Sequence, residues 1–208
     1  MGFQNSSCSF SRFRVLDPVS DELVLQIPDL LRKYAFREID ELPEMSAWGW
    51  SCFDDMFDTE WSAASPKKGD AVFFSLRLDI RRIPAGVIRK YMALAIKEEI
   101  KKLKESGKTY IARERKKEIR EQVLFKLKKH FLPVPGEFNV VWSIANNEIW
   151  FASTQTKIID LFMEQFLKTF NLHLEHKTPY VLAQMILGEE NQEKLDSIEE
   201  TNFAITRP

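Results

Sequence analysis

Acidic residues at two places in the sequence have the types that could carry metal-dependent nuclease chemistry. Such sites use carboxylates that rigid elements hold within a few ångströms of paired divalent ions. The first group lies in an acidic, turn-rich stretch that is predicted to be a loop, without a companion base at a telling spacing, and comprises Asp54, Asp55, Asp58, Glu60 and Asp70.

The second group is a Glu-x-Lys pattern, Glu175 to Lys177, with Asp160 upstream. One nuclease superfamily carries this pattern, but Asp160 falls in a predicted helix rather than on a strand. The geometric demands of general acid–base chemistry are therefore not met by the pattern alone. A metal-dependent exonuclease stays as an alternative function, and no catalytic residue is assigned.

Other chemical motifs fail on spacing or number. Gly107-Lys108-Thr109 resembles the end of a phosphate-binding loop, but Lys102 stands where the pattern needs a glycine, and a helix rather than a strand precedes it. Two cysteines, Cys8 and Cys52, are too few for a disulfide framework or a closed zinc site. No metal site and no cofactor are predicted.

Charge is distributed very unevenly along the chain. The segment from Arg81 to Lys129 holds 17 Lys or Arg against six Glu, a surplus of 11, whereas the rest holds 13 basic and 25 acidic residues. A balanced Lys/Glu run would indicate a solvated helix face, but most of these cations lack acidic partners at i,i+4. The pattern favours a phosphate-binding element on an acidic body.

The basic residues recur at helical spacing. Within two predicted helices, about 85–106 and 110–131, they form stripes apart from the apolar positions, and on the second helix they are expected opposite its packing side. Aromatic residues are not interleaved with them, so duplex backbone is a better target than single strands. The predicted DNA-binding residues are Lys90, Lys97, Lys101, Lys104, Lys108, Arg113, Lys116, Lys117 and Arg120.

The elements around this segment predict an α+β fold. Val72 to Ile80 alternates apolar and polar residues, as a half-buried strand does. Further strands are expected near 8–16, 46–53, 138–153 and 171–176. Helices are expected up to Phe36, with Pro28 opening a second part, and over 156–170 and from Thr178. Trp142 is expected to pack, and Trp61 to be the best exposed tryptophan.

The predicted architecture is an antiparallel sheet body with packed helices and a projecting basic two-helix hairpin. Three parts follow: residues 1–84 as an N-terminal α+β part, 85–133 as the hairpin, and 134–208 as a C-terminal α+β part that completes the body. No apolar run approaches the ~20 residues of a membrane span, and the N-terminus lacks a signal-peptide layout.

The stretch from Ile83 to Leu167 resembles the recombination-associated protein RdgC family. Weaker likeness extends upstream through Ala35-Phe36 and Trp48-Gly49-Trp50 and fades near Pro179. The residues that carry the likeness are Pro84, Val87-Ile88, Ile96, Lys101, Leu103, Glu121, Val123-Leu124, Leu127, Leu132-Pro133, Phe138, Trp142, Asn147, Ile149, Ser153 and Lys157.

The resemblance implies a homodimer that encircles duplex DNA and restrains recombinase filaments, with a location at the nucleoid; the cytoplasm is expected from the lack of a signal peptide and of a membrane span. Full-length relatives continue through a further C-terminal segment, so a closed ring, an open clamp, a different dimer and a monomer all stay open. We expect a non-catalytic protein that binds double-stranded DNA without sequence preference. Besides the exonuclease, the alternative is a protein-interaction module that uses the hairpin for assembly.

Overall fold

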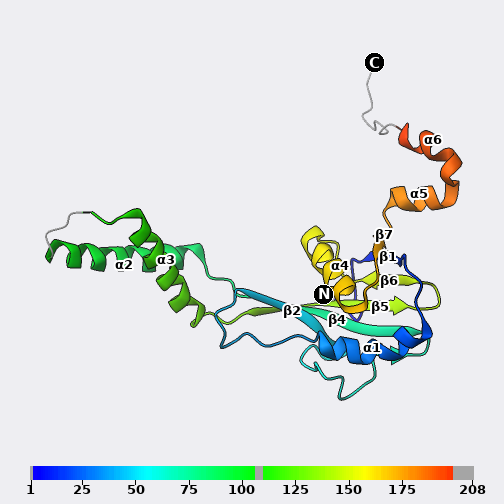
Figure 1. Ribbon diagram of the computed structural model, residues 1–208, viewed down its shortest axis with the longest axis horizontal. Helices are drawn as coiled ribbons and strands as arrows, with labels where there is room; N and C mark the ends of the chain where they lie inside the picture. The colour runs from blue at the N-terminus through cyan, green and yellow to red at the C-terminus, as the bar shows by residue number, and fades with distance from the viewer. Residues whose placement is uncertain (1, 106–109, 199–208) are drawn as a thin grey trace.

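The computed structural model describes residues 2–105 and 110–198 (Figure 1). Its body is one seven-stranded antiparallel sheet with the strand order β2-β4-β5-β6-β1-β7, and β3 also pairs with β4. The predicted fold class is confirmed: helices pack on the sheet body, and a two-helix hairpin projects from it. The strands are β1 Ser11–Val15, β2 Ser46–Cys52, β3 Lys67–Lys68, β4 Ala71–Ile80, β5 Val134–Ser143, β6 Glu148–Phe151 and β7 Leu174–His176.

The helices lie in three places along the chain. α1 and α4 belong to the body, α2 and α3 form the hairpin, and the short α5 and α6 follow the last strand. None of the helices in the described part of the chain is both long and apolar enough to cross a membrane. Their bounds are α1 Asp21–Lys33, α2 Ala85–Glu105, α3 Arg113–Lys128, α4 Thr156–Phe170, α5 Pro179–Leu187 and α6 Gln192–Asp196.

One face of the sheet carries the main core. Alternate residues of β4, among them Phe74 and Leu76, are fully buried against α1 and α4. α4 contributes an aromatic row at helical spacing, in which Phe162 and Phe166 have ring centroids 5.8 Å apart. The helix ends at Asn171, whose left-handed backbone lets its N–H donate to the carbonyl of Leu167 at 2.8 Å.

The opposite face of the sheet is polar but also largely buried near β4 and β5. Asn139 donates to the hydroxyl of Ser75 at 2.9 Å, and Ser75 donates to Glu137 at 3.0 Å. Further along β4, Arg77 forms a bidentate pair with Asp79 at 2.9 and 2.8 Å. Because buried polar groups need partners, this network satisfies the residues that alternate with the core positions.

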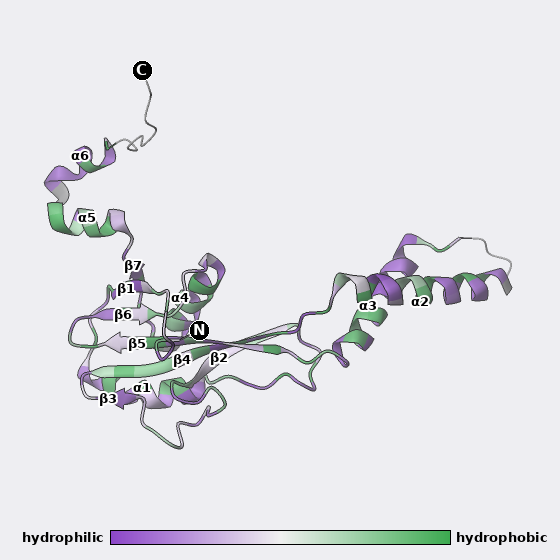
Figure 2. Ribbon diagram, turned by 180° about the vertical axis from the view of Figure 1, so that it is seen from behind, coloured by the Kyte–Doolittle hydropathy of each residue, from purple (hydrophilic) through white to green (hydrophobic). Residues whose placement is uncertain are grey.

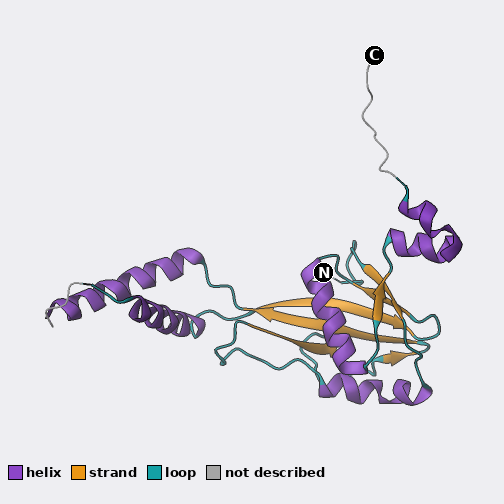
Figure 3. Cartoon of the chain, turned by 45° about the horizontal axis from the view of Figure 1, so that its top comes forward, coloured by secondary structure: helices purple, strands orange, loops and turns teal. Residues whose placement is uncertain are grey.

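The helical hairpin is an insertion between two neighbouring strands. β4 and β5 stay in register along ten residue pairs, from Ala71 opposite Ser143 to Ile80 opposite Val134. The chain leaves the sheet after Ile80, forms α2 and α3, and returns at Val134. In Figure 3 the two helices therefore lie beyond the end of the long strands, with no sheet beneath them. Both flanking parts of the sequence supply strands to the one sheet.

Two predictions about single residues are wrong. Pro28 does not begin a second helix but lies inside α1, whose Ile27 and Leu31 are buried on either side of it, so packing holds the helix together across the proline. Trp61 is not exposed: it belongs to the core and is 5% exposed. The preceding carbonyl, that of Glu60, accepts a hydrogen bond from Arg32 at 3.1 Å, which ties this loop to α1.

Not every apolar position of the helices is buried. On α4, Ile159, Phe162 and Phe166 are buried, but Leu167 is 38% exposed. On α2, Tyr91 and Ile100 are exposed. The expected packing of Trp142 is confirmed, since this side chain is fully buried.

Candidate nucleic-acid interface

The hairpin is fixed to the body by one buried arginine. Arg81, the first residue after β4, is 1% exposed. Its guanidinium donates five hydrogen bonds of 2.5–3.0 Å to backbone carbonyls, those of Ile39, Asp40, Leu42, Glu44 and Phe131. Planar guanidinium groups suit such convergent acceptors. Arg81 therefore joins the base of the hairpin to the loop before β2 and is not part of the surface charge.

The two helices pack through a small apolar cluster of their own. Ile119, Val123 and Leu127 of α3 are buried and repeat every four residues along one side of the helix. They contact half-buried residues that include Ile88, Met92 and Ala95 of α2. This separate cluster explains how the hairpin keeps its shape away from the main core.

An ion pair extends this packing outward. Arg115 of α3 donates to Glu99 of α2 with Nε–Oε1 at 2.7 Å and Nη2–Oε2 at 3.2 Å, and also to Glu118 at 2.8 Å. The pair holds the pKa of the Glu99 carboxyl below its ordinary value. Arg115 is thus committed within the hairpin, and the charge available to a ligand comes from other residues.

Four lysines form an exposed stripe along α2. Lys90, Lys97, Lys101 and Lys104 are all exposed. At about 100° per residue, their mean direction lies about 180° from that of Ile88, Met92 and Ala95, so the stripe faces away from α3. At 1.5 Å per residue it is ~21 Å long, or about six base-pair steps of duplex.

The sequence predicts that the basic residues of α3 lie opposite its packing side, and this prediction is wrong. Arg113, Lys116, Lys117 and Arg120 are exposed. Their mean direction lies only about 70° around the helix from the buried line of α3. This angle follows from the spacing of the residues at about 100° each, so the expectation of an opposite side was a misjudgement of the helical geometry. The stripe on α2 and the cluster on α3 therefore point in different directions.

These cations are free of acidic partners in the described part of the chain. No ion pair involves any of the eight basic residues just named, and Lys90 lies 5.9 Å from the ring of Tyr91. The ninth predicted residue, Lys108, falls outside the described residues. In Figure 2 hydrophilic and hydrophobic residues alternate along the hairpin helices, whereas β4 is mostly hydrophobic.

Large apolar side chains are interspersed with the stripe. Leu94 is 48% exposed, Tyr91 46% and Ile100 38%. α3 begins at Arg113, and its ion pair with α2 joins Arg115 to Glu99. The part of α2 that follows Glu99 is therefore little covered by α3. The surface of α2 therefore combines unpaired positive charge with exposed hydrocarbon.

Two of the acidic residues that suggested nuclease chemistry, Asp54 and Asp58, bind groups of their own loop and its neighbouring strand. Asp58 accepts backbone N–H groups of Glu60 and Ser62 at 3.0 and 2.8 Å, and Asp54 pairs with Lys68 at 2.7 Å. Carboxylates used this way stabilise turns. Within residues 2–105 and 110–198, no three potential ligands of the His, Cys, Asp or Glu types gather around a common point.

The residues of the Glu-x-Lys pattern form ion pairs of their own. Glu175 pairs with Arg14 at 2.8 Å and Lys177 pairs with Glu148 at 3.2 Å. Lys177 lines one pocket together with Asp160 of α4, whereas Glu175 is not among the residues that line this pocket. The structure therefore brings Lys177 and Asp160 to one place and leaves Glu175 outside it.

Arg81 thus fixes the position of the hairpin, and the exposed lysines and arginines of α2 and α3 give it its positive charge. A comparison with the models of known protein families gives no match, and a comparison with curated proteins gives no match either.

Proposed function

We propose that this protein binds double-stranded DNA without sequence preference through the exposed cations of α2 and α3. The observation that carries the proposal is the stripe of Lys90, Lys97, Lys101 and Lys104, which is exposed and free of ion pairs in the described structure. An isolated row of cations of this length suits the regular phosphate spacing of a duplex, because phosphate contacts need charge rather than base-specific geometry.

The different directions of the stripe and the α3 cluster add a geometric condition. A flat ligand would contact either the lysine stripe of α2 or the basic cluster of α3. DNA can contact both only if it lies in a concave binding site or if two hairpins approach it. The resemblance to RdgC proteins extends the proposal accordingly: a homodimer, as a ring or a clamp, acts on DNA at the nucleoid and restrains a recombinase. This extension rests on the resemblance and on the geometry of the hairpin together.

One observation favours a second candidate, assembly through the hairpin. Leu94 and Ile100 lie exposed beside the stripe, and apolar side chains next to charge are common at protein interfaces. In this alternative the same surface binds an acidic protein or a second copy of the chain, and DNA does not compete for it.

The test is fluorescence anisotropy with a random-sequence duplex, titrated across salt. Neutralisation of about six phosphates gives a slope of log K against log salt of about −5. Changing Lys101, Lys104 and Lys116 to Glu should abolish binding, since three attractions become repulsions. A matched variant changes three exposed lysines away from the hairpin, Lys67, Lys157 and Lys194, to Glu with the same change in net charge.

The two variants separate local from overall charge. Loss of binding in the hairpin variant and near wild-type binding in the body variant support the proposal. Equal losses would mean that only net charge matters, and a salt slope near zero would contradict the electrostatic account. A stable complex of the wild type that excludes duplex would favour the assembly alternative.

A further inference from the structure

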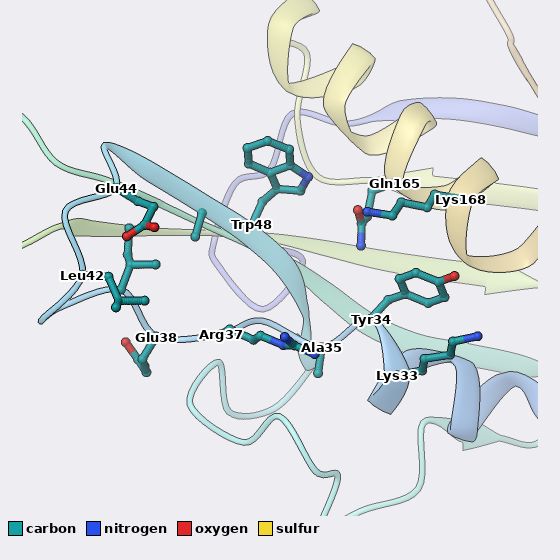
Figure 4. Close-up of a pocket in the computed structure, with 12 residues that line it drawn as sticks. Lys33, Tyr34, Ala35, Arg37, Glu38, Leu42, Glu44, Trp48, Gln165 and Lys168 are labelled. Atoms are coloured by element: carbon teal, nitrogen blue, oxygen red, sulfur yellow. The ribbon is translucent and has the colours of Figure 1, made fainter.

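A second feature lies on the core side of the sheet, away from the hairpin helices. It is a groove of about 540 Å³ between the end of α1, the chain after it, β2 and α4 (Figure 4). Its walls include Lys33, Tyr34, Arg37, Trp48 and Gln165, with Lys168 at the rim. Nothing in the duplex-binding proposal uses this groove.

An unpartnered amide lies in the groove. Gln165 is 5% exposed as a whole residue, and none of the hydrogen bonds described for this chain uses its side-chain amide, which opens into the groove. The helix backbone that carries it is held in place, because Trp50 donates to Thr169 at 2.8 Å and Thr169 donates to the carbonyl of Gln165 at 2.7 Å. In Figure 4 the amide extends from α4 into the space between Trp48 and Tyr34.

The groove also provides an aromatic surface. Trp48 lies on β2, on the same side of the strand as the fully buried Trp50, but it is 42% exposed where the helices no longer cover the sheet. A half-exposed indole beside the amide of Gln165 offers a stacking surface next to a donor and an acceptor. Nucleobases combine a flat face with such an edge.

The charge of the groove favours an anion. The ammonium groups of Lys33 and Lys168 lie 5.4 and 5.8 Å from the centre of the Tyr34 ring. Neither lysine has an ion-pair partner among the described residues, and the same holds for Arg37. Of the two carboxylates that line the groove, Glu38 is bound to Arg77 at 2.9 Å. Three cations thus face one uncommitted carboxylate, that of Glu44.

We propose that this groove binds a nucleobase that carries a phosphate, with the base on Trp48, its edge on Gln165 and the phosphate near Lys168, whose ammonium lies beside Gln165 in Figure 4. Lys33 and Arg37 add positive charge to the walls of the groove. The chemistry has two sources, a free nucleotide or the unpaired end of a DNA strand. The inference goes beyond duplex binding by the hairpin, and only the strand-end source rests on the proposed function.

The first experiment is isothermal titration calorimetry of the full chain with deoxyadenosine 5′-monophosphate, deoxyadenosine and inorganic phosphate. If the nucleotide is the source, it should bind at least about tenfold more tightly than either fragment, since both halves of the groove contribute. W48A should then weaken binding about 5- to 100-fold, the range for loss of one base stack. W48F should recover part of this loss.

The second experiment compares a blunt duplex with one that carries a single-stranded overhang of about five nucleotides. A strand-end site predicts tighter binding of the overhang duplex, and W48A should remove that gain while leaving affinity for the blunt duplex unchanged. Q165L should reduce whichever binding is observed, because it removes the amide and keeps the approximate volume.

Matched controls make the outcome specific. Trp150 is 45% exposed on the other face of the sheet, so W150A should bind like the wild type. The hairpin variant with Lys101, Lys104 and Lys116 changed to Glu should lose duplex binding but keep nucleotide binding, which separates failure of one proposal from failure of the other. The inference is overturned if the nucleotide binds no more tightly than its fragments and the overhang duplex no more tightly than the blunt one. It is also overturned if W48A and Q165L leave the tighter binding unchanged.

Discussion

Arg115 in α3 donates two hydrogen bonds to Glu99 in α2, with Nε–Oε1 at 2.7 Å and Nη2–Oε2 at 3.2 Å. Bidentate pairs of this kind fix orientation as well as distance. The pair lies beyond the apolar cluster of Ile119, Val123 and Leu127, so it sets the angle at which the outer half of α2 leaves α3. The direction of the lysine stripe depends on that angle.

Replacing Glu99 with Gln should therefore loosen the hairpin without unfolding the sheet. Hydrogen exchange of the amides in α2 and α3 should become faster, whereas exchange in β4 and β5 should stay the same. Glu98→Gln is the control, because the neighbouring Glu98 is exposed and takes part in no ion pair within the described residues. Equal exchange in the two variants would show that the pair does not hold the helices.

The same pair should make hairpin stability depend on pH. The pKa of the Glu99 carboxyl is lowered by its hydrogen bonds to Arg115. A lowered pKa means that the pair stabilises the fold above the ordinary pKa of glutamate, about 4.5, and that this contribution is lost as pH falls through the folded-state pKa. The difference in hairpin exchange, corrected for intrinsic rates, between wild type and E99Q should be present at pH 7 and shrink once the pH falls below about 4.5, through the lowered pKa of Glu99. A difference that persists at low pH would contradict this assignment.

Arg81→Met tests the attachment of the hairpin to the body. The change leaves five backbone carbonyls without their donor, and we expect a loss of about 3 kcal/mol in the free energy of unfolding, since some of these carbonyls can take up water instead. Urea unfolding measures the loss. Arg82→Met is the matched control, because Arg82 is the next residue and is exposed. A similar effect of both changes would show that Arg81 acts through general charge.

The two helices of the hairpin could be predicted from the sequence, but the hydrogen bonds that attach the hairpin to the body could not. Helical spacing of Ile119, Val123 and Leu127, with Pro133 beyond, predicts the second helix from local residues alone. Arg81 looked like one more surface cation, because its acceptors include Ile39, Asp40, Leu42 and Glu44, about forty positions earlier. Contacts at such separations leave no local pattern.

The groove was beyond sequence reasoning for the same reason. Trp48 and Gln165 come from β2 and α4, and the packing of Trp50 against Thr169, Phe162 and Phe170 brings these two elements together. Trp61 shows the opposite error: a turn-rich linker predicts exposure, but the indole packs in the main core.

Tryptophan accessibility checks this correction directly. Acrylamide should quench the fluorescence of Trp48 and Trp150, which are 42% and 45% exposed, and should hardly reach Trp50, Trp61 and Trp142. Trp61→Phe should therefore leave the accessible part of the emission unchanged, and Trp48→Phe should reduce it. If W61F removes most of the quenchable emission, Trp61 is exposed in solution and its assignment to the core is wrong.

Gly49→Ala tests the close contact that forms one wall of the groove. The segment after α1 runs along β2, where Phe36 N–H donates to the carbonyl of Trp50 at 2.8 Å. A Cβ on Gly49 would lie 2.5 Å from the backbone nitrogen of Phe36. Backbone atoms cannot yield as a flexible side chain can, so the segment must separate from the strand. We expect a loss of about 3 kcal/mol in unfolding free energy.

Gly86→Ala provides the contrast, because a Cβ there meets nothing within 4 Å and the residue lies in the first turn of α2. It should be neutral or stabilise the protein by up to about 0.5 kcal/mol. Since Tyr34 and Arg37 flank Phe36 and line the groove, G49A should also weaken ligand binding there in the fraction that stays folded, while the hairpin still binds duplex. Full stability in G49A would mean that residues 34–36 do not lie against β2 in solution, and the groove would then lack that wall.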